Sequence, residues 1–268
     1  MIDYLIIGGG IIGTFIAREL AQYETQVTLL EKEEKLAQLQ TTHNSALVHS
    51  PVVITPPKGY LKSKFALEGN LMYPEIVEKF DIPALTIGAY LLAMDEKQFK
   101  KAKKMAEGAK ARGINEVRVM TGDEMRAEEP NLTEHVYGGL DMPTAMTVDT
   151  YALVTRIASN ARMNGADILT GESVSSIDTH EDGTFTVHTV KGSTYKARHV
   201  INAAGVKNRE VASMVEKMVP YTMKPRRGEY YVVKPEEEGS IAKRTLFPLP
   251  GKTTKGVLIT PQPDGTAR

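Results

Sequence analysis

The chain has 268 residues, of which 41% are hydrophobic and 25% are charged, close to the average for soluble globular proteins. Its 33 lysine and arginine residues balance its 33 aspartate and glutamate residues, so we expect no nucleic-acid partner. The absence of cysteine excludes disulfides, thiolate ligands and cysteine nucleophiles, and we expect no metal site.

The N-terminus and the longest apolar runs bear on localisation. A short apolar run reaches Gly8 without a preceding basic region, so a secretory signal is not expected. No later stretch approaches the ~18 apolar residues of a membrane span. We therefore expect a cytoplasmic protein, with peripheral membrane association as an open alternative.

The first segment of the chain predicts a βαβ unit. Tyr4–Ile7 is an apolar run that ends in three glycines, which is typical of a buried parallel strand and a tight turn. Apolar residues at helical spacing follow through Gln22, and Gln26–Glu31 has the pattern of a second strand.

The later segments predict further helices and strands in a mixed order. Helices are expected over 61–80, 95–112, 149–165 and 210–217, with Asp95 as a cap and Thr121 with Glu124 as a capping box. Apolar residues at helical spacing mark one face of the first helix and one of the third: Leu61, Phe65, Met72, Ile76 and Phe80, and Leu153, Val154, Ile157 and Ala161. Strands are expected over 87–94, 117–120, 174–179, 185–190, 199–202, 229–233 and 256–260. The three strands from 174 to 202 predict an antiparallel meander.

Glycines 8, 10 and 13 fit the pattern G-x-G-x-x-G between the first strand and the helix. The first makes the turn, the second lets the backbone approach a pyrophosphate, and the third allows close packing of helix on strand. Amide groups at the start of the helix, including those of Ile11 and Ile12, would face the phosphates.

Glu31 ends the second strand, eighteen positions after Gly13, and could accept hydrogen bonds from ribose hydroxyls. Lys32 follows it and belongs to the same expected cofactor site. A glycine turn with a solvated Glu31 is the structural alternative. The motif predicts an ADP-containing dinucleotide and does not separate FAD from NAD.

Residues 41–50, with the sequence TTHNSALVHS, resemble the flavin-facing loop of the D-amino-acid-oxidase-like FAD superfamily. The Asn-Ser pair followed by a histidine resembles the FAD-dependent glycerol-3-phosphate dehydrogenases and oxidases and their relatives, the L-2-hydroxyglutarate oxidases. The segments 200–205, 227–231 and 255–257 also resemble this family in the same order. The resemblance favours FAD over NAD.

The resemblance implies an α/β fold with a Rossmann-like FAD-binding domain, containing the βαβ unit and the three-stranded meander. An α+β substrate domain, built on a mostly antiparallel sheet, is interleaved with it. We expect the FAD-binding domain to comprise residues 1–82 and 144–218, and the substrate domain residues 83–143 and 219–268.

The resemblance also implies roles for individual residues. His49 is the expected base that takes the hydroxyl proton of the substrate, and the alternative is a histidine that hydrogen-bonds to the backbone. Lys255 occupies the position of the family's substrate-site lysine and could pair with an anion. The remaining expected contacts are to the flavin, its phosphates or its adenine: Thr41, Thr42, Asn44, Ser45 (also assigned to the catalytic site), Val174, Ala203, Ala204 and Gly205.

The resemblance therefore predicts an FAD-dependent enzyme that removes a hydride from a CH–OH group of a small anionic substrate, with sn-glycerol 3-phosphate as first choice. An L-2-hydroxy acid and an amino acid are the alternative substrates, and oxygen or a quinone would accept the electrons. Oligomeric state is unassigned. Family members continue well beyond the position of Arg268, so an FAD-binding fragment without turnover is the alternative of another class.

Overall fold

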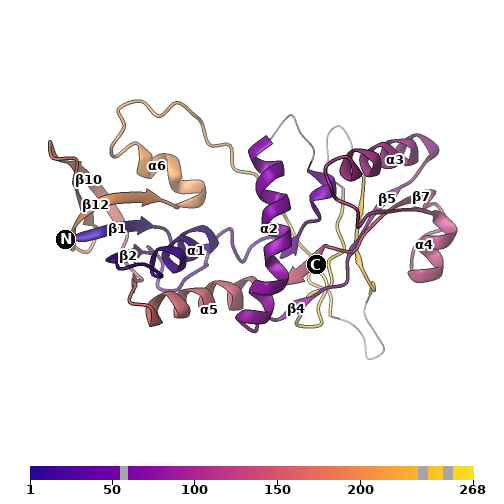
Figure 1. Cartoon of the computed structure of the whole chain (residues 1–268), viewed down its shortest axis with the longest axis horizontal. Coiled ribbons are helices and arrows are strands. Elements are labelled where there is room, and N and C mark those ends of the chain that lie inside the picture. The colour runs from indigo at the N-terminus through magenta and orange to yellow at the C-terminus, as the bar shows by residue number, and fades with distance from the viewer. Residues whose placement is uncertain (55–59, 235–240, 250–255) are drawn as a thin grey trace. The chain divides into compact units, whose positions relative to one another are not determined.

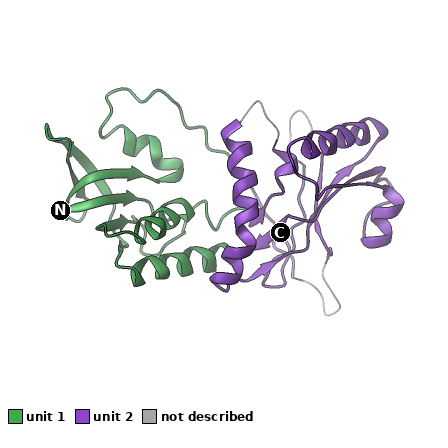
Figure 2. Cartoon of the chain, viewed as in Figure 1, with its two compact units in different colours: residues 1–44, 150–228 green, residues 45–149, 229–268 purple. Residues whose placement is uncertain are grey.

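The computed structural model describes residues 1–54, 60–234, 241–249 and 256–268 (Figure 1). The chain divides into two compact units, each assembled from two separate segments (Figure 2). Unit 1 comprises residues 1–44 and 150–228, and unit 2 comprises residues 45–149 and 229–268. The sequence analysis placed residues 45–82 and 144–149 with the FAD-binding domain and residues 219–228 with the substrate domain. In the structure, residues 45–82 and 144–149 belong to unit 2 and residues 219–228 to unit 1. The assignment of FAD binding and substrate binding to particular domains stays a prediction.

Unit 1 is built on a six-stranded sheet in the order β10-β11-β12-β1-β2-β9. The strands are β1 (Ile2–Ile7), β2 (Val27–Leu30), β9 (Asp167–Leu169), β10 (Val174–Thr179), β11 (Phe185–Thr189) and β12 (Thr194–Asn202). The helices are α1 (Ile11–Leu20), α5 (Thr150–Met163) and α6 (Asn208–Ala212). Strands β12, β1, β2 and β9 run parallel, whereas β10, β11 and β12 form an antiparallel meander. This arrangement confirms the predicted Rossmann-like fold with its meander.

Helices α1 and α5 pack together in unit 1 through small side chains. Ala17 of α1 and Ala158 and Ala161 of α5 are fully buried, together with Val154. Small residues allow two helix backbones to approach closely. The buried residues of α5 recur at helical spacing, as the sequence predicted. α1 and α5 therefore share one buried core with the strands of unit 1.

The described residues of unit 2 form two sheets. A four-stranded sheet has the order β13-β5-β7-β6, from β13 (Thr245–Pro248), β5 (Ala89–Ala93), β7 (Gly138–Met142) and β6 (Arg118–Thr121). A three-stranded sheet has the order β3-β8-β4, from β3 (Leu47–Val48), β8 (Met146–Val148) and β4 (Ala84–Leu85). The helices are α2 (Tyr60–Lys79), α3 (Glu96–Lys110) and α4 (Gly122–Glu128). All pairings except that of β13 with β5 are antiparallel, which confirms the predicted mostly antiparallel sheet.

Two helices of unit 2 begin at the caps that the sequence predicted. The Asp95 carboxylate accepts a hydrogen bond of 2.7 Å from the Gln98 amide at the start of α3. Thr121 and Glu124 form the reciprocal bonds of a capping box at the start of α4. Each cap satisfies backbone amides that have no partner inside the helix.

Three sequence predictions for the secondary structure are wrong. Residues 229–233 form no strand and make one isolated bridge at Val233, and residues 256–260 make one at Ile259. Helix α6 covers 208–212 rather than 210–217. Residues 229–233 are exposed, and only single positions of the other two segments are buried, such as Thr260 and Val211. Local propensity alone does not complete an element.

The expected apolar face of α2 is also wrong. Leu61, Phe65 and Met72 are 61%, 60% and 57% exposed, and only Ile76 and Phe80 of the expected face are half-buried. The buried residues of this helix are Ser63 and Asn70. Periodicity located the helix correctly but placed the inner face on the opposite side. The physical reason is that both polar side chains have partners in unit 2: Asn70 donates to two backbone carbonyls, and Ser63 Oγ accepts a hydrogen bond from Arg112.

Candidate functional site

The turn between β1 and α1 requires glycine at two positions. Gly8 has a φ of +115°, and a Cβ there would lie 2.5 Å from the Ala203 carbonyl oxygen. A Cβ on Gly13 would lie 1.9 Å from the carbonyl oxygen of Gly8. These distances match the roles that the motif gives to its first and third glycines, a tight turn and close packing of helix on strand.

The start of α1 is suited to an anion. The amide of Ile11 donates to Thr41 Oγ1 at 3.1 Å, and Gly10 precedes the helix in an extended conformation. No acidic residue of α1 itself lies in its first turn, so the amides at the helix start keep their partial positive charge along the helix. A phosphate group is the ligand that such a helix start binds best.

Glu31 lies at the end of β2 and is 8% exposed. Its Oε2 accepts a hydrogen bond from the Gly9 amide at 2.6 Å, and its Oε1 accepts one from the Glu33 amide at 2.9 Å. The carboxylate thus ties the end of β2 to the glycine turn. A carboxylate has about four acceptor positions, so ribose hydroxyls could still donate to it.

A cavity of about 420 Å³ opens beside this turn, within unit 1. It gathers residues from the glycine turn, from the end of β2, from segment 37–41, from the start of β10 and from the end of β12. The predicted cofactor residues in its wall are Gly8, Gly10, Ile11, Ile12, Glu31, Lys32, Thr41, Val174, Ala203, Ala204 and Gly205. Gly13, Thr42, Asn44 and Ser45, which were also predicted to bind the cofactor, are not in this wall.

Several residues of the cavity wall were missed by the sequence analysis. They are the apolar residues Ile7, Leu30, Ala37, Leu39, Val211 and Met214 and the polar residues Gln38, Gln40, Glu172, Ser173, Lys207 and Glu210. Val211 and Met214 are spaced three apart and could have indicated one apolar face of a short helix. The glutamine and glutamate positions carry no pattern that distinguishes them from ordinary surface residues.

The end of β12 lies directly beside the glycine turn, as the resemblance implied. β12 pairs in parallel with β1, with Leu5 opposite Val200 and Ile7 opposite Asn202. The Ala203 amide donates to the Ile7 carbonyl at 2.9 Å. Small residues at this strand end leave the backbone of β12 open to the cavity.

The predicted flavin loop is held by hydrogen bonds to its own backbone in unit 1. Thr42 Oγ1 donates to the Ala37 carbonyl at 2.6 Å, and Asn44 Nδ2 donates to the Gln40 carbonyl at 2.7 Å. His43 Nδ1 lies 2.9 Å from the Leu39 carbonyl. Short polar residues in loops commonly bond in this way, and their contact with a flavin stays a prediction.

The second part of the flavin loop belongs to unit 2. Gln262 Nε2 donates to the Ser45 carbonyl at 3.3 Å, and Ala46 has a φ of +57°, a conformation rare for a residue other than glycine. The loop then enters β3, which pairs with β8. His49 follows; its ring meets the Phe247 ring edge to face, with centroids 6.0 Å apart. Lys255 lies outside the described residues.

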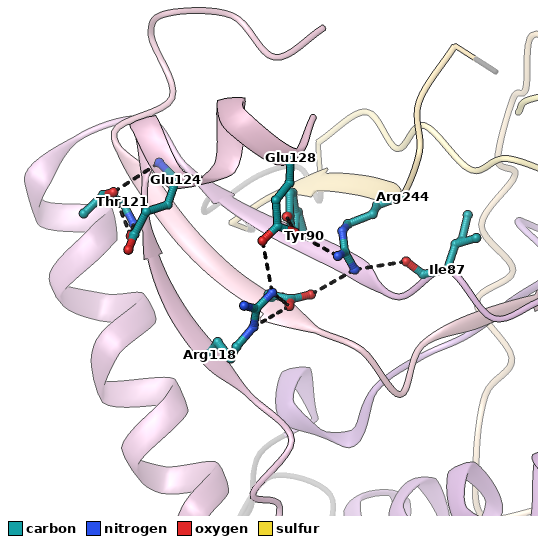
Figure 3. Close-up of polar contacts among 8 residues, drawn as sticks. Ile87, Tyr90, Arg118, Thr121, Glu124, Glu128 and Arg244 are labelled. Atoms are coloured by element: carbon teal, nitrogen blue, oxygen red, sulfur yellow. Dashed lines mark hydrogen bonds and ion pairs between the residues drawn. The ribbon is translucent and has the colours of Figure 1, made fainter. Parts of the chain in front are cut away.

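A cluster of charged residues that the sequence analysis missed lies on the four-stranded sheet of unit 2 (Figure 3). It consists of Tyr90, Arg118, Glu128, Asp141 and Arg244. Arg118 Nε donates to the buried Asp141 at 2.9 Å, and Arg244 donates to Glu128 at 2.9 Å. Tyr90 donates to Glu128 at 2.7 Å.

The pKa values in this cluster follow from these contacts. Burial and the bond to Glu128 raise the pKa of the Tyr90 hydroxyl, while the Tyr90 hydrogen bond, followed by Arg244 and Arg118, lowers the pKa of Glu128. Two guanidinium groups thus balance two carboxylates. We interpret the cluster as structural, because its charges are already paired with one another.

Comparison with known proteins identifies the family. Residues 3–268 match the DAO family of FAD dependent oxidoreductases. The chain belongs to this family. This confirms the family, the fold and the family's cofactor, FAD, as predicted from the loop and the glycine turn.

Individual relatives differ in substrate. The chain is 32% identical over 265 residues to a glycerol 3-phosphate dehydrogenase of Caloramator mitchellensis, covering 99% of this chain and 54% of the relative. It is 31% identical over 270 residues to an L-2-hydroxyglutarate dehydrogenase of Escherichia coli K12, covering 99% and 62%. The chain thus spans between half and two thirds of the length of these curated relatives.

A solved structure gives the same assignment. The L-alpha-glycerophosphate oxidase of Mycoplasma pneumoniae, dithionite reduced and with FAD bound, superposes with a TM-score of 0.85 at 27% identity, covering 99% of this chain and 70% of that one. Separately, no helix in the described part of the DAO-family chain is both long and apolar enough to cross a bilayer.

Proposed function

We propose that this chain binds FAD through unit 1 and belongs to an enzyme that oxidises the CH–OH group of a small anionic substrate, with sn-glycerol 3-phosphate as first choice. The observation that carries the proposal is the 420 Å³ cavity, which brings the predicted dinucleotide-binding residues together from separate segments of unit 1. The glycine turn and the start of α1 suit the pyrophosphate, and Glu31 suits the ribose.

The flavin, when bound, would accept the hydride of the substrate. The protein's own contribution is to bind and orient the substrate and to take its hydroxyl proton. We propose that His49 takes this proton at a ring nitrogen, because a neutral imidazole accepts protons near neutral pH. Ser45, Asn44 and Lys255 are proposed to contact the flavin or the anionic group of the substrate.

The first step of the experiment measures the visible absorbance of flavin bound to the purified chain. The purified chain, as isolated or after reconstitution with FAD and gel filtration, should retain a flavin absorbance. Retention supports FAD binding and argues against a dehydrogenase that uses NAD alone. A colourless protein that does not retain FAD would overturn the cofactor assignment.

The second step is anaerobic addition of sn-glycerol 3-phosphate, with L-2-hydroxyglutarate and glycine in parallel samples. Bleaching of the oxidised flavin by glycerol 3-phosphate, and its loss in His49→Ala, is the expected result. Bleaching by L-2-hydroxyglutarate alone would favour the second candidate, which the 31% identity to the E. coli enzyme supports.

A third outcome is retention of FAD without reduction by any of the substrates. It would favour an FAD-binding fragment, for which the coverage of 54% and 62% of two relatives is the supporting observation. Where a substrate does bleach the flavin, re-oxidation by air or by a soluble quinone would identify the electron acceptor, which we propose to be one of these two.

A further inference from the structure

The most buried positions on the inner face of α2 are polar, with the half-buried Leu67 packed against the core between them, although a helix packed on a protein core is normally apolar on that side. Its two buried residues are Ser63 and Asn70, which are 8% and 5% exposed. A buried amide costs free energy unless its hydrogen bonds are made, so a buried asparagine indicates specific partners.

The partners of Asn70 are two backbone carbonyls from different segments of unit 2. Its Nδ2 donates to the carbonyl of His49 at 3.3 Å and to the carbonyl of Thr144 at 2.9 Å. Two carbonyl neighbours fix which end of the amide faces them, because only the NH₂ group can donate. One side chain thus ties the peptide after His49 to the turn before β8.

The segment around His49 is held on both sides of this tie. Before it, β3 pairs with β8, with Val48 opposite Met146. After it, Arg112 donates to the Ile54 carbonyl at 3.0 Å and to Ser63 Oγ at 3.2 Å. The backbone at His49 is therefore held on both sides, which sets the direction of its Cα–Cβ bond.

We propose that Asn70 is a positioning residue for His49: it holds the His49 carbonyl so that the imidazole keeps its edge-to-face orientation against Phe247. The effect on catalysis rests on the proposed role of His49 as base. The claim that Asn70 sets the orientation of the His49 ring does not depend on that role. A leucine at position 70 would have no hydrogen-bond donor. An aspartate would face the two carbonyls with acceptor oxygens, and two acceptors form no hydrogen bond. The amide donor of asparagine therefore suits this position.

The test uses the full chain, labelled with ¹³C at histidine Cε1, and two variants. Asn70→Asp is nearly isosteric and lacks the donor, and Asn70→Ala removes the amide without adding charge. The control is Asn131→Asp, since Asn131 Nδ2 likewise donates to a backbone carbonyl of unit 2, that of Ile241, at 3.1 Å. The chain has six histidines, and loss of one signal in His49→Gln assigns that of His49.

The expected result is a shift of the His49 signal in both Asn70 variants, because the ring moves relative to the Phe247 ring current. The other five histidine signals should stay in place and show that the fold is kept. Asn131→Asp should leave the His49 signal unchanged. An unmoved His49 signal in folded Asn70→Asp and Asn70→Ala would overturn the proposal.

A second measurement separates this proposal from the proposed function. If substrate bleaches the bound flavin, the reduction rate constant should fall on the order of tenfold or more in Asn70→Asp, since small displacements of a catalytic group are costly. Substrate affinity should change less than about twofold. If substrate fails to reduce the unchanged protein, the proposed function fails, while the histidine signal still decides the role of Asn70.

Discussion

The carboxylate of Glu31 accepts a hydrogen bond from the backbone amide of Gly9 at 2.6 Å. The bond joins the end of β2 to the glycine turn that precedes α1. The same carboxylate accepts from the Glu33 amide, so both oxygens hold the backbone before any ligand binds. Glu31 therefore has a structural role in addition to the ribose contact that its position predicts.

The substitution Glu31→Gln should weaken both roles. A glutamine offers one acceptor oxygen where the carboxylate offers two, so one buried amide loses its partner, and the free energy of unfolding should fall by about 1–3 kcal/mol. FAD affinity should fall as well. Urea denaturation of the apoprotein measures the first effect, and quenching of FAD fluorescence on titration measures the second.

Glu33→Gln is the matched control for this substitution. The Glu33 side chain pairs with Lys32 at 3.1 Å on an exposed surface, and its backbone amide is unchanged by the substitution. Exposed ion pairs contribute about 0–1 kcal/mol, so stability and FAD affinity should hardly change. Equal losses in the two variants would contradict the role given to Glu31.

Replacing a glycine inside a helix by alanine usually stabilises a protein, but at Gly13 in α1 we expect the opposite effect. A Cβ on Gly13 would lie 1.9 Å from the Gly8 carbonyl oxygen, so Gly13→Ala must displace backbone and should destabilise the protein and impair FAD binding. A Cβ on Gly108 of α3 meets nothing within 4 Å. Gly108→Ala should therefore stabilise the chain by about 0.5–1 kcal/mol. Thermal denaturation of both variants checks the pair, and a neutral Gly13→Ala would contradict the close packing.

The βαβ unit and its glycine turn were predictable because their signals are local. Apolar runs, helical spacing and the distance from Gly13 to Glu31 all lie within one short segment. The capping box of Thr121 and Glu124 is local for the same reason. Sequence patterns of this kind report on neighbours along the chain.

The charged cluster on the sheet of unit 2 could not be predicted in this way. Arg244 reaches Glu128, which lies 116 positions earlier, and nothing in either neighbourhood indicates the pairing. The inner face of α2 was predicted wrongly because apolar spacing was taken as burial. The buried side chain of Asn70 donates to the carbonyls of residues 49 and 144, and only folding brings these segments together.

Thr41 offers a test of the contact between the predicted flavin loop and the start of α1. Its Oγ1 accepts from the Ile11 amide at 3.1 Å, so Thr41→Val removes the partner of a helix-start amide and should cost about 1 kcal/mol in the free energy of unfolding. Thr41→Ser keeps the hydroxyl and should restore most of the loss. Urea denaturation compares the three proteins, and equal stability of the valine and serine variants would contradict the cap.

The charged cluster predicts a pH-dependent contribution to stability. The Tyr90 hydrogen bond, with Arg244 and Arg118, lowers the pKa of Glu128 below its ordinary value of 4.5 in the folded chain. A group with a depressed folded pKa stabilises the protein above its unfolded pKa, and this contribution is lost as the pH falls through the folded pKa. Glu128→Gln should therefore destabilise the chain at neutral pH and lose this effect in acid.

The measurement is urea denaturation of the unchanged protein and of Glu128→Gln across the range from neutral pH to about pH 3. The difference in the free energy of unfolding should be constant at neutral pH and should shrink below the ordinary carboxyl value. Glu134→Gln, at an exposed position near α4, is the control and should show little difference at any pH. Tyr90→Phe removes the hydroxyl that donates to Glu128 and should reduce the pH-dependent part. A difference for Glu128→Gln that stays the same at every pH would mean that its charge does not take part in the cluster.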